Sequence, residues 1–94
     1  MRLLVQYTAQ LRAALERAEE EIELSDRSSV ADLLARIASR WSAEATRHVL
    51  TPAGGLQPSL VVVLNSEVVP TGEAHSVLVN SGDVVTLLPP IAGG

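Results

Sequence analysis

The sequence contains no cysteine, no lysine and no phenylalanine, and it has one tyrosine and one tryptophan. Without cysteine there is no disulfide, no iron–sulfur cluster and no thiol nucleophile. Without lysine there is no side-chain amine to form a Schiff base, to build a phosphate loop or to accept an isopeptide bond. Because aromatic residues are so few, aliphatic side chains must fill the core.

Long apolar runs and a basic surface are also missing. No run approaches the ~20 apolar residues that a membrane span needs, and the first residues become polar too quickly for a signal peptide, so we expect a soluble cytoplasmic protein. The net charge is −4, and all seven basic residues are arginines that precede His48. Nucleic-acid binding needs a basic face, so a basic protein partner is the better expectation.

The sequence shows no arrangement of residues that is typical of a catalytic site. His48 and His75 are the only imidazoles and stand on separate segments, so no metal site is expected. Gly54-Gly55 follows no strand and precedes no lysine, unlike a phosphate loop. No serine has a histidine and an acid at a recognisable spacing. We therefore expect a protein that is not an enzyme and binds no cofactor of its own.

A length of 94 residues predicts one domain with a modest core, which we place at residues 1–88, followed by an extended, flexible tail at residues 89–94. The first half predicts a strand over 2–8, with Leu3, Val5 and Tyr7 on its apolar side. A helical turn follows over 9–18. The run Glu19-Glu20-Glu21 is interpreted as a solvated connection, and residues 22–24 as a short strand that pairs with the first.

The strongest helix signal begins at Ser29, where Asp32 three residues later completes a capping box. Apolar residues then fall on one helical face: Val30, Leu33, Leu34, Ile37 and Trp41. Residues 42–50 are expected to form a shorter helical piece, and residues 51–55 a loop.

The second half predicts three more strands. Residues 60–64 form an aliphatic run typical of a central strand buried on both faces. Asn65-Ser66 predicts a tight turn into a short strand over 67–69. In the connection over 70–80, residues 77–79 are expected to reach the core, and residues 84–88 form the last strand. With one strong helix, this order favours an α+β fold with a mixed sheet, the ubiquitin-like β-grasp, over a ferredoxin-like fold.

The last six residues are Pro89-Pro90-Ile91-Ala92-Gly93-Gly94. Proline cannot extend a sheet ladder and stiffens the chain, whereas glycine can enter a narrow channel in any backbone conformation. We expect the Gly94 α-carboxylate to be presented without hindrance, so that another enzyme can activate it as a mixed anhydride with AMP.

This closing segment, from the Gly82-Asp83 turn through an apolar strand to two prolines and a diglycine, resembles that of MoaD/ThiS-type sulfur carriers. The resemblance extends to residues 9–12, to the helix over 30–37 and to residues 63–65, and the length and the proline pair favour the MoaD branch. It implies that an adenylyltransferase of the ubiquitin-activating type uses ATP to adenylate Gly94. A persulfide donor then makes a thiocarboxylate, which delivers sulfur to a partner enzyme such as the large subunit of molybdopterin synthase.

The resemblance also implies a docking surface on the open face of the sheet, made of Thr8, Val68 and Leu88. The tail residues Pro89, Pro90, Ile91, Ala92 and Gly93 would enter the partner. In the molybdopterin branch, aromatic residues commonly stand where this chain has Thr8 and Leu88, so the acceptor stays open: it could equally belong to cysteine, thiamine or tRNA thiolation. We expect the free protein to be a monomer.

Two hypotheses of other kinds remain. A ubiquitin-like modifier would use the same adenylated Gly94 but attach it to a lysine of a target protein, and lacking lysine it could not build chains through its own side chains. A plain β-grasp interaction domain would bind its partner without any chemistry at the tail.

Overall fold

The computed structural model describes residues 1–89. In chain order the elements are strand β1 (Arg2–Tyr7), helix α1 (Ala9–Leu15), strand β2 (Glu19–Glu23), helices α2 (Val30–Ala38) and α3 (Ala43–Thr46), strands β3 (Val61–Leu64) and β4 (Glu67–Val69), the 3-10 turn η1 (Thr71–Glu73) and strand β5 (Val84–Leu88).

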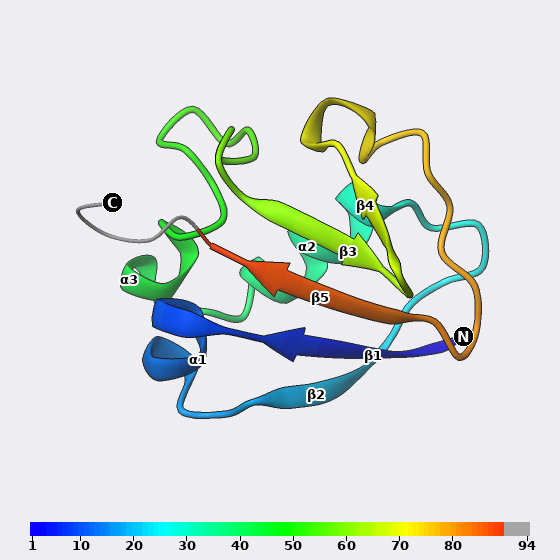
Figure 1. Cartoon of the computed structure of the whole chain (residues 1–94), viewed down its shortest axis with the longest axis horizontal. Coiled ribbons are helices and arrows are strands. Elements are labelled where there is room, and N and C mark those ends of the chain that lie inside the picture. Colours follow the sequence, from blue (N-terminus) through cyan, green and yellow to red (C-terminus); the bar gives the residue numbers. More distant parts are fainter. Residues whose placement is uncertain (90–94) are drawn as a thin grey trace.

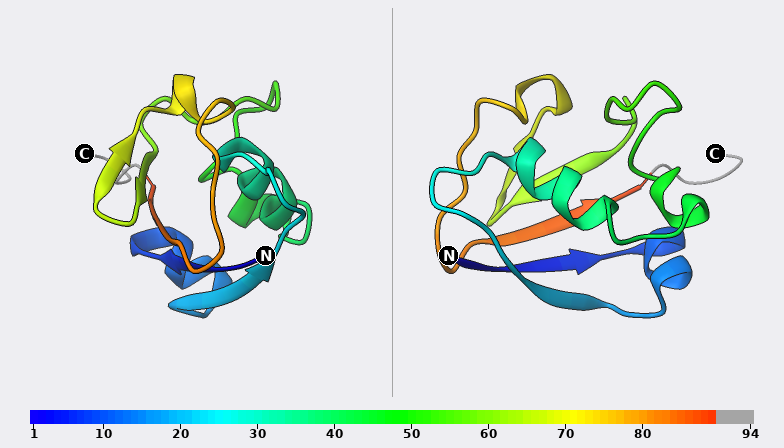
Figure 2. Two further views of the ribbon diagram at one scale, coloured as in Figure 1. Left: turned by 90° about the vertical axis from the view of Figure 1, so that its right-hand side faces the viewer. Right: turned by 180° about the vertical axis from the view of Figure 1, so that it is seen from behind.

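The strands form one mixed sheet in the order β2-β1-β5-β3-β4. β1 and β5 are parallel, and every other neighbouring pair is antiparallel. Parallel neighbours need a crossover connection, which here contains α2. Helix α2 covers one face of the sheet and leaves the other open, while α1 and α3 lie at the end where β5 finishes (Figures 1 and 2). This arrangement confirms the predicted β-grasp fold.

Helix α2 packs as its sequence predicts. The Ser29 hydroxyl accepts a hydrogen bond from the Asp32 backbone, and the Asp32 carboxylate accepts one from the Ser29 backbone, so the capping box is complete. The apolar stripe of α2 is fully buried against Leu3, Val5 and Tyr7 of the central strands, among others. Trp41 lies beyond the helix end and is only half-buried.

The interpretation of Glu19-Glu20-Glu21 as a solvated connection was wrong. These residues begin β2, which pairs with β1 through contacts such as Gln6↔Glu19 and Leu3↔Ile22. Strand alternation turns Glu20 toward the helix-covered face and its two neighbours toward solvent. The side chain of Glu20 is 11% exposed, and its hydrogen-bond partners include two residues distant in the chain, Tyr7 and Arg40.

The prediction that residues 60–64 form a strand buried on both faces was also wrong. The central strand is β5, and β3 alternates: Val62 is fully buried, whereas Val61 is 39% exposed. In the connection before β5, Val79 is buried as expected but Leu78 is 53% exposed. An apolar run therefore marked the strand correctly without revealing which of its sides is covered.

A hydrogen-bonded clamp holds the turns at one end of the sheet. Asn65, at φ 59°, donates from its side-chain amide to the Asp83 carboxylate at 3.2 Å and accepts from the Val84 backbone at 3.0 Å. The other carboxylate oxygen of Asp83 accepts from the Asn80 backbone at 2.7 Å. Gly82, at φ 88°, supplies the turn before β5. The clamp sets the register with which β5 enters between β1 and β3.

Candidate partner-binding face

The open face of the sheet exposes aliphatic side chains over β3, β4 and β5. Val68 is 64% exposed and Leu88 is 38% exposed, and Val61 pairs directly with Leu88 across the two strands. Val63, two residues after Val61 on β3, pairs with Val68 on β4. Large exposed apolar side chains that cluster on one surface are typical of interaction sites.

Of the predicted docking residues, Val68 and Leu88 lie on this open face. Thr8 follows β1 at the end of the sheet beside β5, where its hydroxyl donates to the Leu87 carbonyl at 2.9 Å. Thr8 is half-buried and also precedes the first turn of α1. Sequence reasoning missed Val61 and Val63, because the whole of β3 was assigned to the core.

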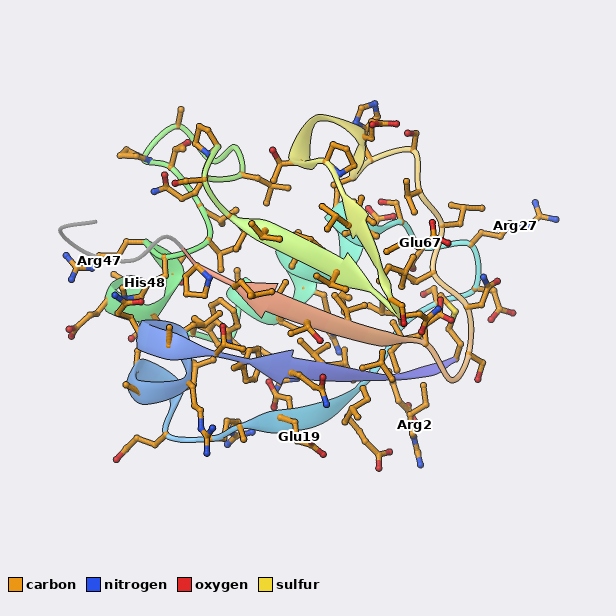
Figure 3. The ribbon with its side chains drawn as sticks, in the orientation of Figure 1. Arg2, Glu19, Arg27, Arg47, His48 and Glu67 are labelled. Atoms are coloured by element: carbon orange, nitrogen blue, oxygen red, sulfur yellow. The ribbon has the colours of Figure 1, made fainter. Side chains whose placement is uncertain are left out.

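The β1–β2 side of the same face is charged (Figure 3). Arg2 donates to the Glu23 carboxylate at 2.8 Å and lies 3.4 Å from the Glu21 carboxylate. The hydrogen bond from Arg2 lowers the pKa of Glu23, and the same bond together with Glu21 raises the pKa of Arg2. The side chain of Glu19 has no ion pair or hydrogen bond within residues 1–89.

On the covered side, Glu20 is the centre of a polar cluster. It accepts a hydrogen bond from the Tyr7 hydroxyl and pairs with Arg17 at 2.6 Å and with Arg40 at 3.1 Å. Burial raises the pKa of Tyr7 well above its ordinary value, and the hydrogen bond to Glu20 raises it further. The Tyr7 ring meets Trp41 edge-on, with ring centres 5.7 Å apart. This cluster ties β2 to the end of α2 and needs no ligand to be satisfied.

The strand β5 leads directly to the predicted reactive end. Pro89, which follows β5, is buried. The remaining site residues named from the sequence, Pro90, Ile91, Ala92, Gly93 and Gly94, lie outside the described residues.

Two other kinds of site, a metal site and a membrane span, find no support in residues 1–89. That part of the chain holds no group of three histidine, cysteine, aspartate or glutamate residues placed to bind a metal ion, and none of its helices is both long and apolar enough to cross a bilayer. The labelled arginines Arg2, Arg27 and Arg47 lie at separate places on the molecule (Figure 3).

Comparison with solved structures agrees with the fold. SAMP1 from *Haloferax volcanii* matches over 100% of both chains, with 22% identity and a TM-score of 0.85. A putative molybdopterin converting factor subunit 1 from *Pyrococcus furiosus* matches over 97% of this chain and 99% of its own, with 26% identity and a TM-score of 0.72. The BexX/CysO complex of *Amycolatopsis orientalis* contains a chain with 26% identity and a TM-score of 0.68, covering 98% of this chain and 99% of that one.

No curated protein matches the sequence. The family model described as the ThiS family matches residues 5–94, nearly the whole chain. The match includes the aliphatic residues of the open face, the polar cluster and the diglycine. The chain therefore belongs to the ThiS family of small ubiquitin-like sulfur carrier proteins, which are not catalytic themselves.

Proposed function

We propose that this protein carries sulfur as a thiocarboxylate on Gly94, and that the sulfur is used to make molybdopterin. The observation that carries the proposal is the family match, which runs through the diglycine to residue 94. β5 is the central strand of the sheet, and the chain passes from it through Pro89 to the segment that contains Gly94. The proposed reactive carboxylate thus follows the strand at the centre of the sheet.

The chemistry needs little from the carrier. A carboxylate oxygen of Gly94 attacks the α-phosphorus of ATP in the activating enzyme, and pyrophosphate leaves. The terminal sulfur of a persulfide donor then attacks the carbonyl carbon and expels AMP, which gives an acyl disulfide. A second thiol supplied by the partner enzymes reduces the sulfur–sulfur bond, forms a disulfide with the donor and leaves the thiocarboxylate on Gly94. Because glycine has no Cβ, nothing beside that carbon obstructs either attack. The carrier supplies recognition and the reacting carbonyl, while the partner enzymes supply ATP and sulfur.

Recognition is assigned to the open face and the tail. Thr8, Val68 and Leu88 would contact the adenylyltransferase, and Pro89 to Gly93 would guide the carboxylate into its active site. Proline at positions 89 and 90 limits the number of conformations of this lead-in segment. Less conformational entropy is then lost when the tail is bound.

The molybdopterin assignment rests on the proline pair, on the chain length and on likeness to a protein described as a molybdopterin converting factor subunit. Sulfur delivery to another acceptor uses the same activated Gly94, and one similar chain was solved in a BexX/CysO complex. A modifier role is the second candidate, favoured by the shared fold with SAMP1 and other proteins described as small archaeal modifiers.

The test is the intact mass of the protein isolated from its own cells, with thiol-selective alkylation of the carboxy-terminal peptide. Sulfur in place of oxygen adds nearly the same mass as oxidation of Met1, so the change must be localised to Gly94. A thiocarboxylate there supports sulfur carriage. An unmodified Gly94, even after incubation with the activating enzyme, ATP and a sulfur source, contradicts it, and Gly-Gly remnants on lysines of other proteins would then favour the modifier.

A further inference from the structure

The open face has an apolar half and a charged half, and one row of paired residues crosses both. From β2 to β4 the row is Glu19, Gln6, Thr86, Val63 and Val68, each paired with the next. Neighbouring strands lie about 4.8 Å apart, so Glu19 and Val68 are roughly 19 Å from each other. In the middle of the row Thr86 donates to the Gln6 side chain at 2.9 Å. The two ends of the row therefore differ in chemistry.

Glu19 is the carboxylate of β2 that is left for a partner. Glu21 and Glu23 on the same side of the strand are both paired with Arg2. Glu20 faces the other side and is satisfied by Tyr7, Arg17 and Arg40. Glu19 is exposed and makes no ion pair within residues 1–89.

We infer that the partner covering this face is apolar opposite Val68 and Leu88 and places an arginine or lysine opposite Glu19. This inference rests on the proposed function, since the partner in question is the adenylyltransferase that activates Gly94. Burying the apolar half supplies affinity, whereas complementary charge at the rim sets orientation and speeds association. A neutral or acidic surface over Glu19 would leave a carboxylate desolvated without a partner, which is costly.

Charge argues against a second copy of this chain as the occupant. Arg2 is the one cation that the five strands carry, and it is already shared between two glutamates. The other strand charges on the open face are acidic, and the whole chain carries −4. Two such faces brought together would offer Glu19 no free cation.

The experiment is ATP–pyrophosphate exchange by the purified ubiquitin-activating-type adenylyltransferase of the source organism, with this protein as the varied substrate. Glu19→Gln and Glu19→Arg are compared with Glu44→Gln and Glu44→Arg. Glu44 is exposed on α3 and has no ion pair within residues 1–89. Each Glu44 variant therefore makes the same change in net charge as the corresponding Glu19 variant, and it breaks no ion pair. Melting temperatures of all four variants are measured alongside.

Glu19→Gln is expected to raise the KM for the carrier about threefold at low salt with kcat unchanged. Glu19→Arg should raise KM further, and high salt should remove both differences. The Glu44 variants should behave as the wild type. Equal shifts for the two positions, or tighter binding by Glu19→Arg, would overturn the basic partner site while leaving the proposed function intact. A wild-type chain that supports no exchange overturns the proposed function instead.

Discussion

The two faces of the sheet carry the same types of aliphatic side chain, which are buried on one face and exposed on the other. On the helix-covered face Val62 and Leu87 are fully buried, whereas on the open face Val61 and Leu88, their neighbours in the chain, are each more than a third exposed. Folding accounts for the first pair, because burying a leucine or valine side chain stabilises the fold by about 1.5–3 kcal/mol. It does not account for the second pair, whose exposure fits the proposed contact of this face with a partner enzyme.

The largest expected effect is a difference in stability between two neighbouring residues of β5 that lie on opposite faces of the sheet. Leu87→Ala should lower the free energy of unfolding by about 2–5 kcal/mol, because it leaves a cavity under α2. Leu88→Ala should lower it by less than about 1 kcal/mol, yet raise the KM for the activating enzyme. Urea unfolding followed by the fluorescence of Trp41, the only tryptophan, measures the first quantity. Similar losses of stability in the two variants would contradict a division of labour between the faces.

The next largest effect concerns the register of β5, which determines which of its side chains lie on each face of the sheet. A slip of one residue in β5 would exchange Leu87 with Leu88, and the Asp83 clamp opposes it. Asp83→Ala removes acceptors for the Asn65 amide and the Asn80 backbone, so it should cost about 1–3 kcal/mol. Asp83→Asn is the matched control, since one oxygen remains to accept from Asn80. The same urea titrations measure both variants. If alanine and asparagine cost the same, the carboxylate oxygens are not what holds the turn.

A third prediction tests the polar cluster on the covered face. Since the fold raises the pKa of Tyr7, its proton is held more tightly in the folded than in the unfolded state. The stabilisation is therefore fully present below the unfolded pKa of about 10 and is lost as the pH rises above it, by about 1.4 kcal/mol per pH unit. Lysine and cysteine are absent and Tyr7 is the only tyrosine, so no other side chain titrates between about pH 10 and 11.5.

Tyr7→Phe is the control for this fall in the free energy of unfolding with pH. Phenylalanine keeps the ring against Trp41 but has no proton to lose, so the free energy of unfolding should become flat over the same pH range. Urea unfolding at successive pH values measures both proteins. A slope that persists in Tyr7→Phe would mean that another group, rather than the buried phenol, responds to pH.

Local signals predicted much of this fold. Alternation in residues 2–8, the Ser29–Asp32 capping box and the Asn65 turn each act over a few residues, and each prediction is confirmed. The failures involve partners far away in the chain. Three consecutive glutamates look solvated unless Tyr7 and Arg40 are known to meet the middle one.

The candidate site was predictable only in part, for a related reason. A run of valine and leucine is apolar whether a helix or another protein covers it, so residues 60–64 could not reveal their open side. Val68 and Leu88 were found through the family resemblance, and Val61 and Val63 only through the strand pairing. The orientation of Glu19 likewise depends on the register between β1 and β2.

Of these substitutions, Gly94→Ala is expected to have the smallest effect on stability and the largest effect on function. We expect Gly94→Ala to leave both faces of the sheet unchanged, so the melting temperature should stay within about 1 °C of the wild-type value. Its added Cβ stands beside the carboxylate whose oxygen must reach the α-phosphorus of ATP, so pyrophosphate exchange should fall at least tenfold, which corresponds to about 1.4 kcal/mol of activation free energy. Ala92→Gly, two residues earlier, is the control for a general change in the tail. A clear fall in the melting temperature of Gly94→Ala would mean that this residue stabilises the fold, and undiminished exchange would mean that activation does not depend on an unobstructed carboxylate at this position.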